Sequence, residues 1–177
     1  MFNTMPEAIL AFYQGDSTDS EGRMIETIWS WNYQKLEYIH NYIQWLFPLK
    51  ERSRFNQNAP VLNEEVIQAF RTSNELKKRL KKSLEVMLRF YGLECNNLDD
   101  TDIQIIKSND YPERKLNWIE EGNHNYLRLT RILTSLKLLG LENYAQALLN
   151  CLQQIYLEEG ENIGTEMYAY WISVIDD

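Results

Sequence analysis

Apolar residues follow a long helical pattern near the C-terminal end of the chain, which strongly limits the possible folds. Over residues 141–158 these side chains recur every three or four positions, the spacing that places them on one face of an α-helix. They are Leu141, Tyr144, Ala145, Leu148, Leu149, Leu152, Ile155 and Tyr156. The chain has only seven glycines and four prolines, fewer turn residues than an all-β protein needs. The sequence therefore predicts an all-α protein.

Local helix signals extend this prediction along most of the chain. Pro48 ends one helix because a proline disfavours helix in the residue before it. Asn74 is expected to cap another helix, and Gly92 and Gly140 to end two more. Residues 93–117 are polar and acidic, and we expect a loop there with one brief helix or strand. The predicted helices cover residues 5–13, 23–31, 33–47, 63–71, 75–91, 123–139, 141–158 and 165–175.

The length of the chain fits one domain, which can bury a substantial core. We therefore expect residues 1–177 to form a single-domain bundle of about 7–9 helices around a central buried helix at about residues 124–140. Eleven tyrosines and five tryptophans indicate that much of this core is aromatic.

The charge of the chain argues against nucleic acid as a partner. The net charge is −8, whereas nucleic-acid-binding domains are usually basic. Residues 50–92 carry ten Lys and Arg against five acidic residues, and the flanking parts are acidic. We interpret this pattern as oppositely charged faces of one fold. The basic run from Lys77 to Lys82 is interpreted as the solvated side of an amphipathic helix.

Several sequence features indicate the cellular compartment of the protein. The N-terminus has no basic region before an apolar run, so we expect no secretory signal. No apolar stretch approaches the roughly 20 residues that a membrane span needs, so we expect no membrane partner. Cys95 and Cys151 lack metal or redox spacing and are expected to be free thiols in a reducing compartment. The sequence therefore predicts a cytoplasmic protein.

A polar row is predicted beside the core face of the helix at residues 33–47. On a helical wheel, one arc holds the apolar residues Leu36, Ile39, Ile43, Leu46 and Phe47. The row beside that arc consists of Glu37, His40 and Gln44, and the opposite flank holds Tyr38, Tyr42 and Trp45. A polar row at the edge of a core face is a candidate for ligand contact.

A second polar stripe is predicted on the central helix, which is apolar on both sides. Leu127 and Leu138 lie nearly opposite the main apolar face and flank the stripe, which consists of His124, Arg128, Arg131 and Ser135. Buried guanidinium groups need partners, because an uncompensated buried charge costs several kcal/mol. One interpretation is that Arg128 and Arg131 pair with acids such as Glu37 and fix one helix against another. The other is that they line a pocket for an anionic or peptide ligand.

Signals for catalysis and for a metal are weak. The spacing Glu-x-x-His occurs at Glu37 and His40 and again at Glu121 and His124, but Gly122 interrupts the second pair. No Gly-rich phosphate loop and no nucleophile or zinc-protease motif is present. The acidic surroundings of Cys95 would raise the pKa of a thiol. We expect no metal, no cofactor and no catalytic residue, and an enzyme is the less favoured reading.

Three blocks of the chain resemble the conserved N-terminal domain of the opioid growth factor receptor family. The first is LEYIHNYIQWLFPLKERSRFNQNAPVL at residues 36–62, with the family's Tyr-Ile-Gln-Trp-Leu-Phe-Pro run. The others are MLRFYGL at residues 87–93 and HNYLRLTRILTSLKLLGL at residues 124–141, where Leu129 stands in place of the usual isoleucine. The resemblance covers nearly the whole chain.

The resemblance implies an all-helical domain unrelated to membrane opioid receptors. In animal members it implies binding of an enkephalin-type peptide, restraint of cell proliferation and nuclear association. This chain stops near the end of that domain, without the long polar or repetitive tail of the animal proteins. We therefore expect a short stand-alone version of the kind found in microbes. The two polar rows fall within the first and third matching blocks, and we expect the rows to meet.

Three functions remain open. The favoured one is a binding module for a peptide or small anionic ligand, with Arg128 and Arg131 as anion contacts and Trp45 and Tyr42 as apolar walls. The second is a protein-interaction scaffold that uses an exposed aromatic flank or residues 48–62. The third is an enzyme that uses His40 with Glu37 as its orienting partner. The candidate ligand-binding residues are Glu37, His40, Gln44, Trp45, His124, Arg128 and Arg131.

Overall fold

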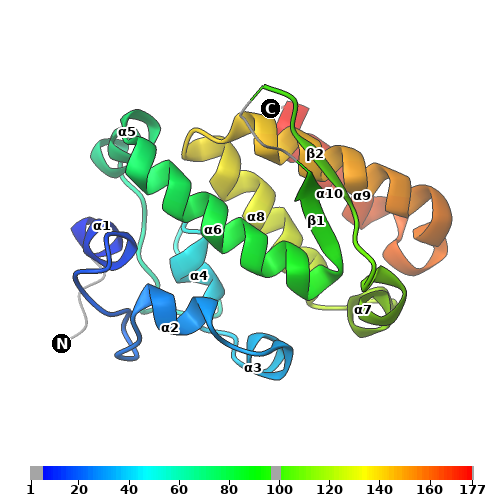
Figure 1. The fold of residues 1–177 in the computed structure, drawn as a ribbon, viewed down its shortest axis with the longest axis horizontal. Helices are drawn as coiled ribbons and strands as arrows, with labels where there is room; N and C mark the ends of the chain where they lie inside the picture. The colour runs from blue at the N-terminus through cyan, green and yellow to red at the C-terminus, as the bar shows by residue number, and fades with distance from the viewer. Residues whose placement is uncertain (1–5, 97–100, 177) are drawn as a thin grey trace. The chain divides into compact units, whose positions relative to one another are not determined.

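The computed structural model describes residues 6–96 and 101–176 (Figure 1). These residues form ten helices and one two-stranded sheet, so the protein is mostly helical. The prediction of a strictly all-α protein is therefore wrong in one detail, the sheet within residues 93–117. Met5, the first residue of the predicted helix 5–13, lies outside the described residues, as do residues 97–100 of the predicted loop.

The chain divides into two compact units. The first comprises the described part of Met1–Ser83 together with Leu138–Gly140, and the second comprises Leu84–Lys137 and Leu141–Asp177. The single-domain arrangement around a central helix remains a prediction.

The first unit contains five short helices and the first part of α6. The short helices are α1 (Glu7–Tyr13), α2 (Ile25–Trp29), α3 (Tyr33–Tyr38), α4 (Ile43–Leu46) and α5 (Glu64–Thr72), and α6 is Asn74–Tyr91. Helix α1 packs against α5. The core of this unit is aromatic, as predicted, because Phe12 makes edge contacts with Tyr13 and Trp45, and Tyr13 with Phe70. All four rings are at most 2% exposed.

Side-chain caps fix where these helices begin. Asn63 accepts a hydrogen bond from the backbone N–H of Val66 at 2.9 Å, which satisfies one of the free donors at the start of α5. The hydroxyl of Ser73 accepts from the N–H of Leu76 at 3.1 Å in the same way. Ser73 and not Asn74 is therefore the cap of α6, and Asn74 is its first helical residue.

The predicted continuous helix over residues 33–47 is wrong. Helix α3 ends at Tyr38, Ile39 is extended, and α4 begins only at Ile43. At this break, the hydroxyl of Tyr42 donates to the carbonyl oxygen of Leu36 at 2.6 Å. In a continuous helix that carbonyl would accept from the N–H four residues later, at His40. The Tyr42 hydroxyl thus bonds to this carbonyl where α3 ends.

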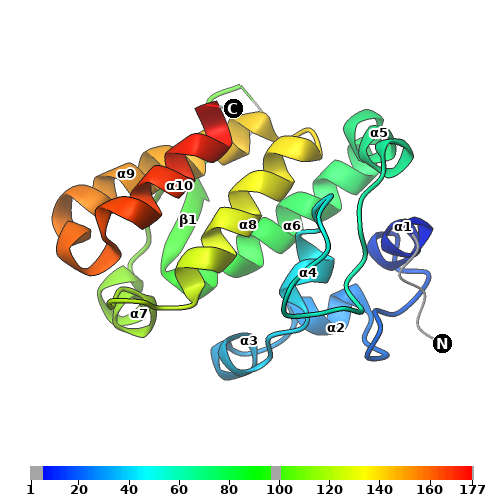
Figure 2. The ribbon, with the colours of Figure 1, turned by 180° about the vertical axis from the view of Figure 1, so that it is seen from behind.

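The second unit contains the rest of α6, the sheet and four further helices. These are β1 (Leu93–Asn96), β2 (Gln104–Lys107), α7 (Tyr111–Trp118), α8 (Asn125–Leu138), α9 (Glu142–Ile163) and α10 (Thr165–Asp176). The strands pair antiparallel, with Cys95 opposite Ile105. Figures 1 and 2 show α9 beside α10, and β2 packs along α9. Helix α9 continues past its predicted end at residue 158 with a kink at Glu159.

An aromatic series forms the core of the second unit. Successive rings meet edge to face at centroid distances of 5.1 to 6.4 Å, through Phe90, Tyr91, Trp118, Tyr126 and Trp171. Two of the indole groups also satisfy backbone carbonyls, because Trp118 donates to Tyr91 and Trp171 donates to Tyr126. This series joins α6, α7, α8 and α10.

Helix α8 is less buried than predicted. Its main face is buried, but Leu127, expected to lie on a second apolar face, is 55% exposed. Leu127 therefore extends into solvent, and α8 is not apolar and buried all round.

Candidate functional site

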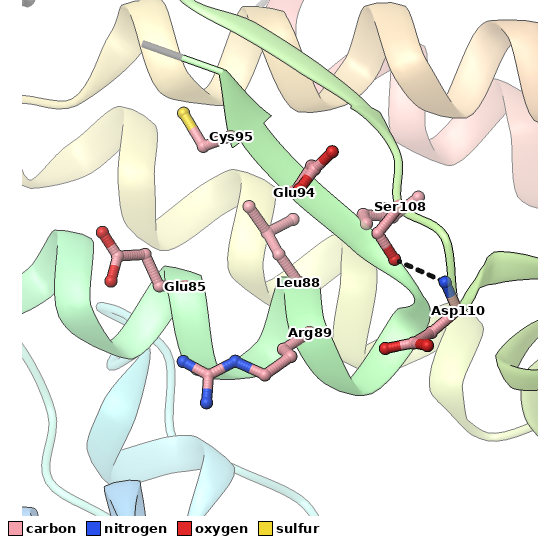
Figure 3. Close-up of a pocket in the computed structure, with 8 residues that line it drawn as sticks. Glu85, Leu88, Arg89, Glu94, Cys95, Ser108 and Asp110 are labelled. Atoms are coloured by element: carbon pink, nitrogen blue, oxygen red, sulfur yellow. Dashed lines mark hydrogen bonds between the residues drawn. The ribbon is translucent and has the colours of Figure 1, made fainter. Parts of the chain in front are cut away.

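The second unit has a pocket of about 370 Å³ formed by α6, β1 and the turn before α7 (Figure 3). A volume of this size lies near the lower end of the range of small-molecule sites. We call it the α6–β1 pocket. Its lining residues are Glu85, Leu88, Arg89, Leu93, Glu94, Cys95, Ser108 and Asp110.

Each element places its lining side chains by its own periodicity. On α6, Glu85, Leu88 and Arg89 are spaced i, i+3 and i+4, so they share one face of the helix. In the turn, the N–H of Ser108 donates to the carbonyl of Gly92 at 2.9 Å. The N–H of Asp110 then donates to the Ser108 hydroxyl at 3.3 Å, which fixes the turn beside the pocket.

Gly92 makes this arrangement possible. Its φ of +80° is in the left-handed region, where the chain can turn from α6 directly into β1. A Cβ atom at this position would lie 2.7 Å from the Cα of Tyr111 and 2.9 Å from the Cβ of Arg114. The absence of a side chain therefore allows α7 to approach the end of α6.

The pocket is acidic with an apolar floor. Leu88 and Leu93 are each 2% exposed, whereas Glu85, Arg89, Glu94 and Asp110 are exposed at its rim. Three carboxylates against one guanidinium leave a net negative charge. This combination favours a ligand that has a positively charged group next to an apolar one.

The first predicted polar row is dispersed by the break between α3 and α4. Glu37 is half-buried at the end of α3, and His40 is exposed between the two helices. Gln44 is buried in α4, where its Oε1 lies 3.4 Å from the Nδ2 of Asn56. These three residues do not form a row on one helix, and their ligand-binding role remains a prediction.

The aromatic flank predicted on the opposite side of the core face from that row is also dispersed. Tyr38 is 75% exposed, whereas Tyr42 is fully buried and Trp45 is 2% exposed. The ring of Trp45 packs on Phe12 in the core. An apolar wall built from Trp45 and Tyr42 remains a prediction.

The second predicted stripe combines exposed and buried side chains. His124 is exposed, Arg131 is half-buried and Arg128 is only 6% exposed. The Nη1 of Arg128 lies 3.4 Å from the Oδ1 of Asn125, and the same oxygen accepts from the hydroxyl of Tyr91 at 3.2 Å. This buried network places a neutral hydrogen-bond acceptor beside the guanidinium group. Pairing of Arg128 with an acid remains a prediction.

The two predicted groups of site residues belong to different units. Glu37, His40, Gln44 and Trp45 are in the first, and His124, Arg128 and Arg131 are in the second. That the two rows meet therefore remains a prediction.

Neither a metal centre nor a membrane span is found in the described part of the chain. Within residues 6–96 and 101–176, no three His, Cys, Asp or Glu side chains gather closely enough to hold a metal ion. In the same residues, every helix is too short or too polar to cross a membrane. Cys95 and Cys151 are both free thiols.

Comparison with known sequences decides the family. A sequence model of the opioid growth factor receptor (OGFr) conserved region matches residues 4–177. The chain belongs to the opioid growth factor receptor family. No solved structure matches it significantly.

The chain is similar to several animal proteins of this family. The opioid growth factor receptor of Mus musculus is 39% identical over 154 residues, which is 85% of this chain and 23% of that protein. The human receptor is 39% identical over 157 residues, 85% of this chain and 22% of its own length. Opioid growth factor receptor-like protein 1 of Xenopus tropicalis is 36% identical over 166 residues, 89% of this chain and 31% of its length. The chain therefore spans about a quarter to a third of these relatives.

The sequence did not predict the α6–β1 pocket, although one of its blocks lies there. The second block that resembles the opioid growth factor receptor family, at residues 87–93, contains Leu88, Arg89 and Leu93. Nothing in the sequence showed that the turn at Ser108 and Asp110 folds back against this block. The antiparallel pairing of β1 with β2 and the bond from Ser108 to Gly92 bring these segments together.

Proposed function

We propose that the chain is a peptide-binding module and that the α6–β1 pocket binds the positively charged end of the peptide. The observation that supports this most directly is the set of carboxylates of Glu85, Glu94 and Asp110 around an apolar floor. A peptide's free amino group supplies the charge, and the side chain of its first residue supplies the apolar part. The pocket has room for one end of a peptide, so the rest would lie across the surface.

Family membership supports a ligand of this kind. The relatives are named as receptors for opioid growth factor. The resemblance implies an enkephalin-type peptide, which begins with tyrosine. Such a peptide has an ammonium group beside an aromatic ring, the combination that an acidic pocket with a leucine floor accommodates.

Each charged contact in such a complex contributes little binding free energy by itself. All three carboxylates are exposed, and an exposed ion pair contributes about 0.2–1 kcal/mol. The apolar floor adds about 25 cal/mol for each Å² of apolar surface that the ligand buries. We therefore expect modest affinity that weakens as the salt concentration rises.

Isothermal titration with a short Tyr-initiated peptide of the enkephalin type tests the proposal. The peptide should bind with a free amino terminus and lose at least about tenfold in affinity when that terminus is acetylated. The double variant Glu94→Gln with Asp110→Asn should lose a similar factor for the free peptide. This double variant should bind the free and the acetylated peptide with similar affinities.

A matched control removes two carboxylates elsewhere in the second unit. Glu121 and Glu161 are exposed and lie outside the pocket lining. Glu121→Gln with Glu161→Gln changes the net charge by the same amount and should leave the affinity within about twofold. Equal binding of the acetylated peptide, or equal losses in both double variants, would contradict the proposal.

A further inference from the structure

The loop at residues 50–58 in the first unit is held in one conformation by its own hydrogen bonds. Ser53 is only 9% exposed, and its hydroxyl accepts from the N–H groups of Phe55 and Asn56 at 3.2 and 3.1 Å. The N–H of Leu62 donates to the carbonyl of Leu49 at 2.8 Å, which joins the two ends of the loop. These bonds define the backbone of the loop.

The base of the loop is attached to the segment that leads into α4. The amide Nδ2 of Asn56 lies 3.4 Å from both the carbonyl of Asn41 and the Oε1 of Gln44. Because Gln44 is 95% buried, the loop is attached to the interior of the unit. A loop that is already ordered loses little conformational entropy when a partner binds.

This ordered loop exposes a large apolar side chain. Phe55 is 87% exposed, the largest exposed fraction of any large hydrophobic side chain in the described residues. The Ser53 hydroxyl holds the N–H of Phe55, so the ring is presented from a fixed backbone. Aromatic side chains of this kind are common anchors of protein interfaces.

The residues beside Phe55 are mostly basic. Lys50, Arg52 and Arg54 are exposed and have no ion-pair partner among residues 6–96 and 101–176, and Glu51 is the one acid between them. These charges stand out in a chain whose net charge is −8. The loop is therefore complementary to a partner with several carboxylates and an apolar side chain.

We propose that the 50–58 loop docks an acidic segment of a partner protein, with Phe55 as the apolar anchor and Arg52 and Arg54 as carboxylate contacts. Arginine suits this role because its guanidinium group binds a carboxylate through two hydrogen bonds. The pattern fits an acidic protein segment better than a membrane surface, whose recognition uses clusters of about four to eight Lys and Arg. Nucleic acid fits less well because the net charge of the chain opposes the phosphates.

A selection from a displayed library of linear peptides, about a dozen residues long, tests the proposal on the full chain. We expect enrichment of sequences that place several Asp or Glu residues beside one Leu, Ile or Phe. The best peptide is then synthesised with a fluorophore, and its affinity is measured by anisotropy. Arg52→Glu with Arg54→Glu should weaken binding at least about thirtyfold, and Phe55→Ser at least about tenfold.

A charge-matched control uses the basic face of α6. Lys78 and Lys82 are exposed, and Lys78→Glu with Lys82→Glu makes the same change in net charge as the loop variant. This control should change the affinity less than about threefold. Circular dichroism melts confirm that each variant is folded, which all five exposed positions should allow.

Three outcomes would overturn the proposal. One is a selection that yields no acidic consensus. Another is an equal loss of affinity in the loop and α6 variants, which would indicate general charge attraction. The third is binding of phosphatidylserine vesicles or of a single-stranded oligonucleotide that needs Arg52, Arg54 and Phe55 while no acidic peptide binds.

Discussion

Trp29 donates a hydrogen bond from its indole Nε1 to the hydroxyl of Ser83, at a distance of 2.9 Å. Ser83 is fully buried, and its hydroxyl also lies 2.9 Å from that of Tyr13. The phenol of Tyr13 donates its single proton to the carbonyl of Leu46, so Ser83 donates to Tyr13 and accepts from Trp29. One hydroxyl on α6 thus satisfies groups on α1 and α2.

Ser83→Ala should lower the free energy of unfolding by about 1–3 kcal/mol, because Trp29 loses its acceptor and Tyr13 loses one of its two hydrogen bonds in or near the core. Urea unfolding followed by circular dichroism measures the change. Ser173 is exposed and bonds only to the nearby carbonyl of Tyr170, so Ser173→Ala is the control and should change little. Equal effects of the two substitutions on the free energy of unfolding would show that the buried hydrogen bonds of Ser83 do not stabilise the fold.

The ion pair between Arg79 and Glu26 should make stability depend on pH. The Nη2 of Arg79 lies 2.6 Å from a carboxylate oxygen of Glu26, and this hydrogen bond lowers the pKa of the carboxyl group. A lowered pKa means that the pair stabilises the fold above the ordinary pKa of glutamate and that this contribution is lost as the pH falls through the lowered value. Because the Glu26 side chain is 52% exposed, the contribution is about 0.2–1 kcal/mol.

Glu26→Gln should therefore destabilise the protein at pH 7, and this effect should diminish as the pH falls through the lowered pKa of the Glu26 carboxyl group. Urea midpoints at several pH values measure this difference. Glu21 is exposed and forms no ion pair within the described residues, so Glu21→Gln is the control. A Glu26 effect that stays constant as the pH falls through this lowered pKa would mean that the charge pair is not its cause.

Gly92 and Gly122 offer a comparison between backbone strain and a steric clash. Both have positive φ, +80° and +72°, but a Cβ at Gly122 would meet nothing within 4 Å. Gly122→Ala should cost about 1 kcal/mol from the left-handed backbone alone. Gly92→Ala should cost at least about 2 kcal/mol more, because its Cβ would clash with the backbone of Tyr111.

Thermal and urea unfolding of the two variants measure the difference. Since Gly92 also positions β1 beside the α6–β1 pocket, Gly92→Ala should weaken peptide binding under the proposed function, whereas Gly122→Ala should not. Similar stability in both variants would show that α7 can move away from α6 at little cost.

The sequence predicted most helices well where their own signals were strong. Helices α5, α6, α8 and α10 begin and end within about two residues of their predicted bounds, because apolar periodicity, caps and terminal glycines agree there. Gly92 ends α6 with a positive φ, as expected of a glycine at that position. Such features are local and can be read from a few neighbouring residues.

The errors arose where distant or side-chain interactions override local preference. No glycine or proline interrupts residues 33–47, so nothing in the sequence indicated that Tyr42 would take the carbonyl of Leu36. The α6–β1 pocket depends on the pairing of two strands separated by a polar segment, which periodicity does not specify. The candidate residues Arg128 and Gln44 were identified as polar positions near a core, but sequence could not show how deeply each is buried.

The two cysteines should differ sharply in their reactivity. Burial raises the pKa of the Cys151 thiol to about 11, and the side chain is only 6% exposed, whereas Cys95 is partly exposed on β1. At pH 8 only about one Cys151 thiol in a thousand is ionised, and the thiolate is the form that reacts with iodoacetamide.

In the Cys95→Ser variant, we therefore expect almost no alkylation of Cys151 in the folded protein and one full equivalent in urea. Mass spectrometry at successive times measures both, with the Cys151→Ser variant as the reactive control. Rapid alkylation of Cys151 without denaturant would mean that α9 opens readily where it packs against β2, since only local unfolding can expose this thiol.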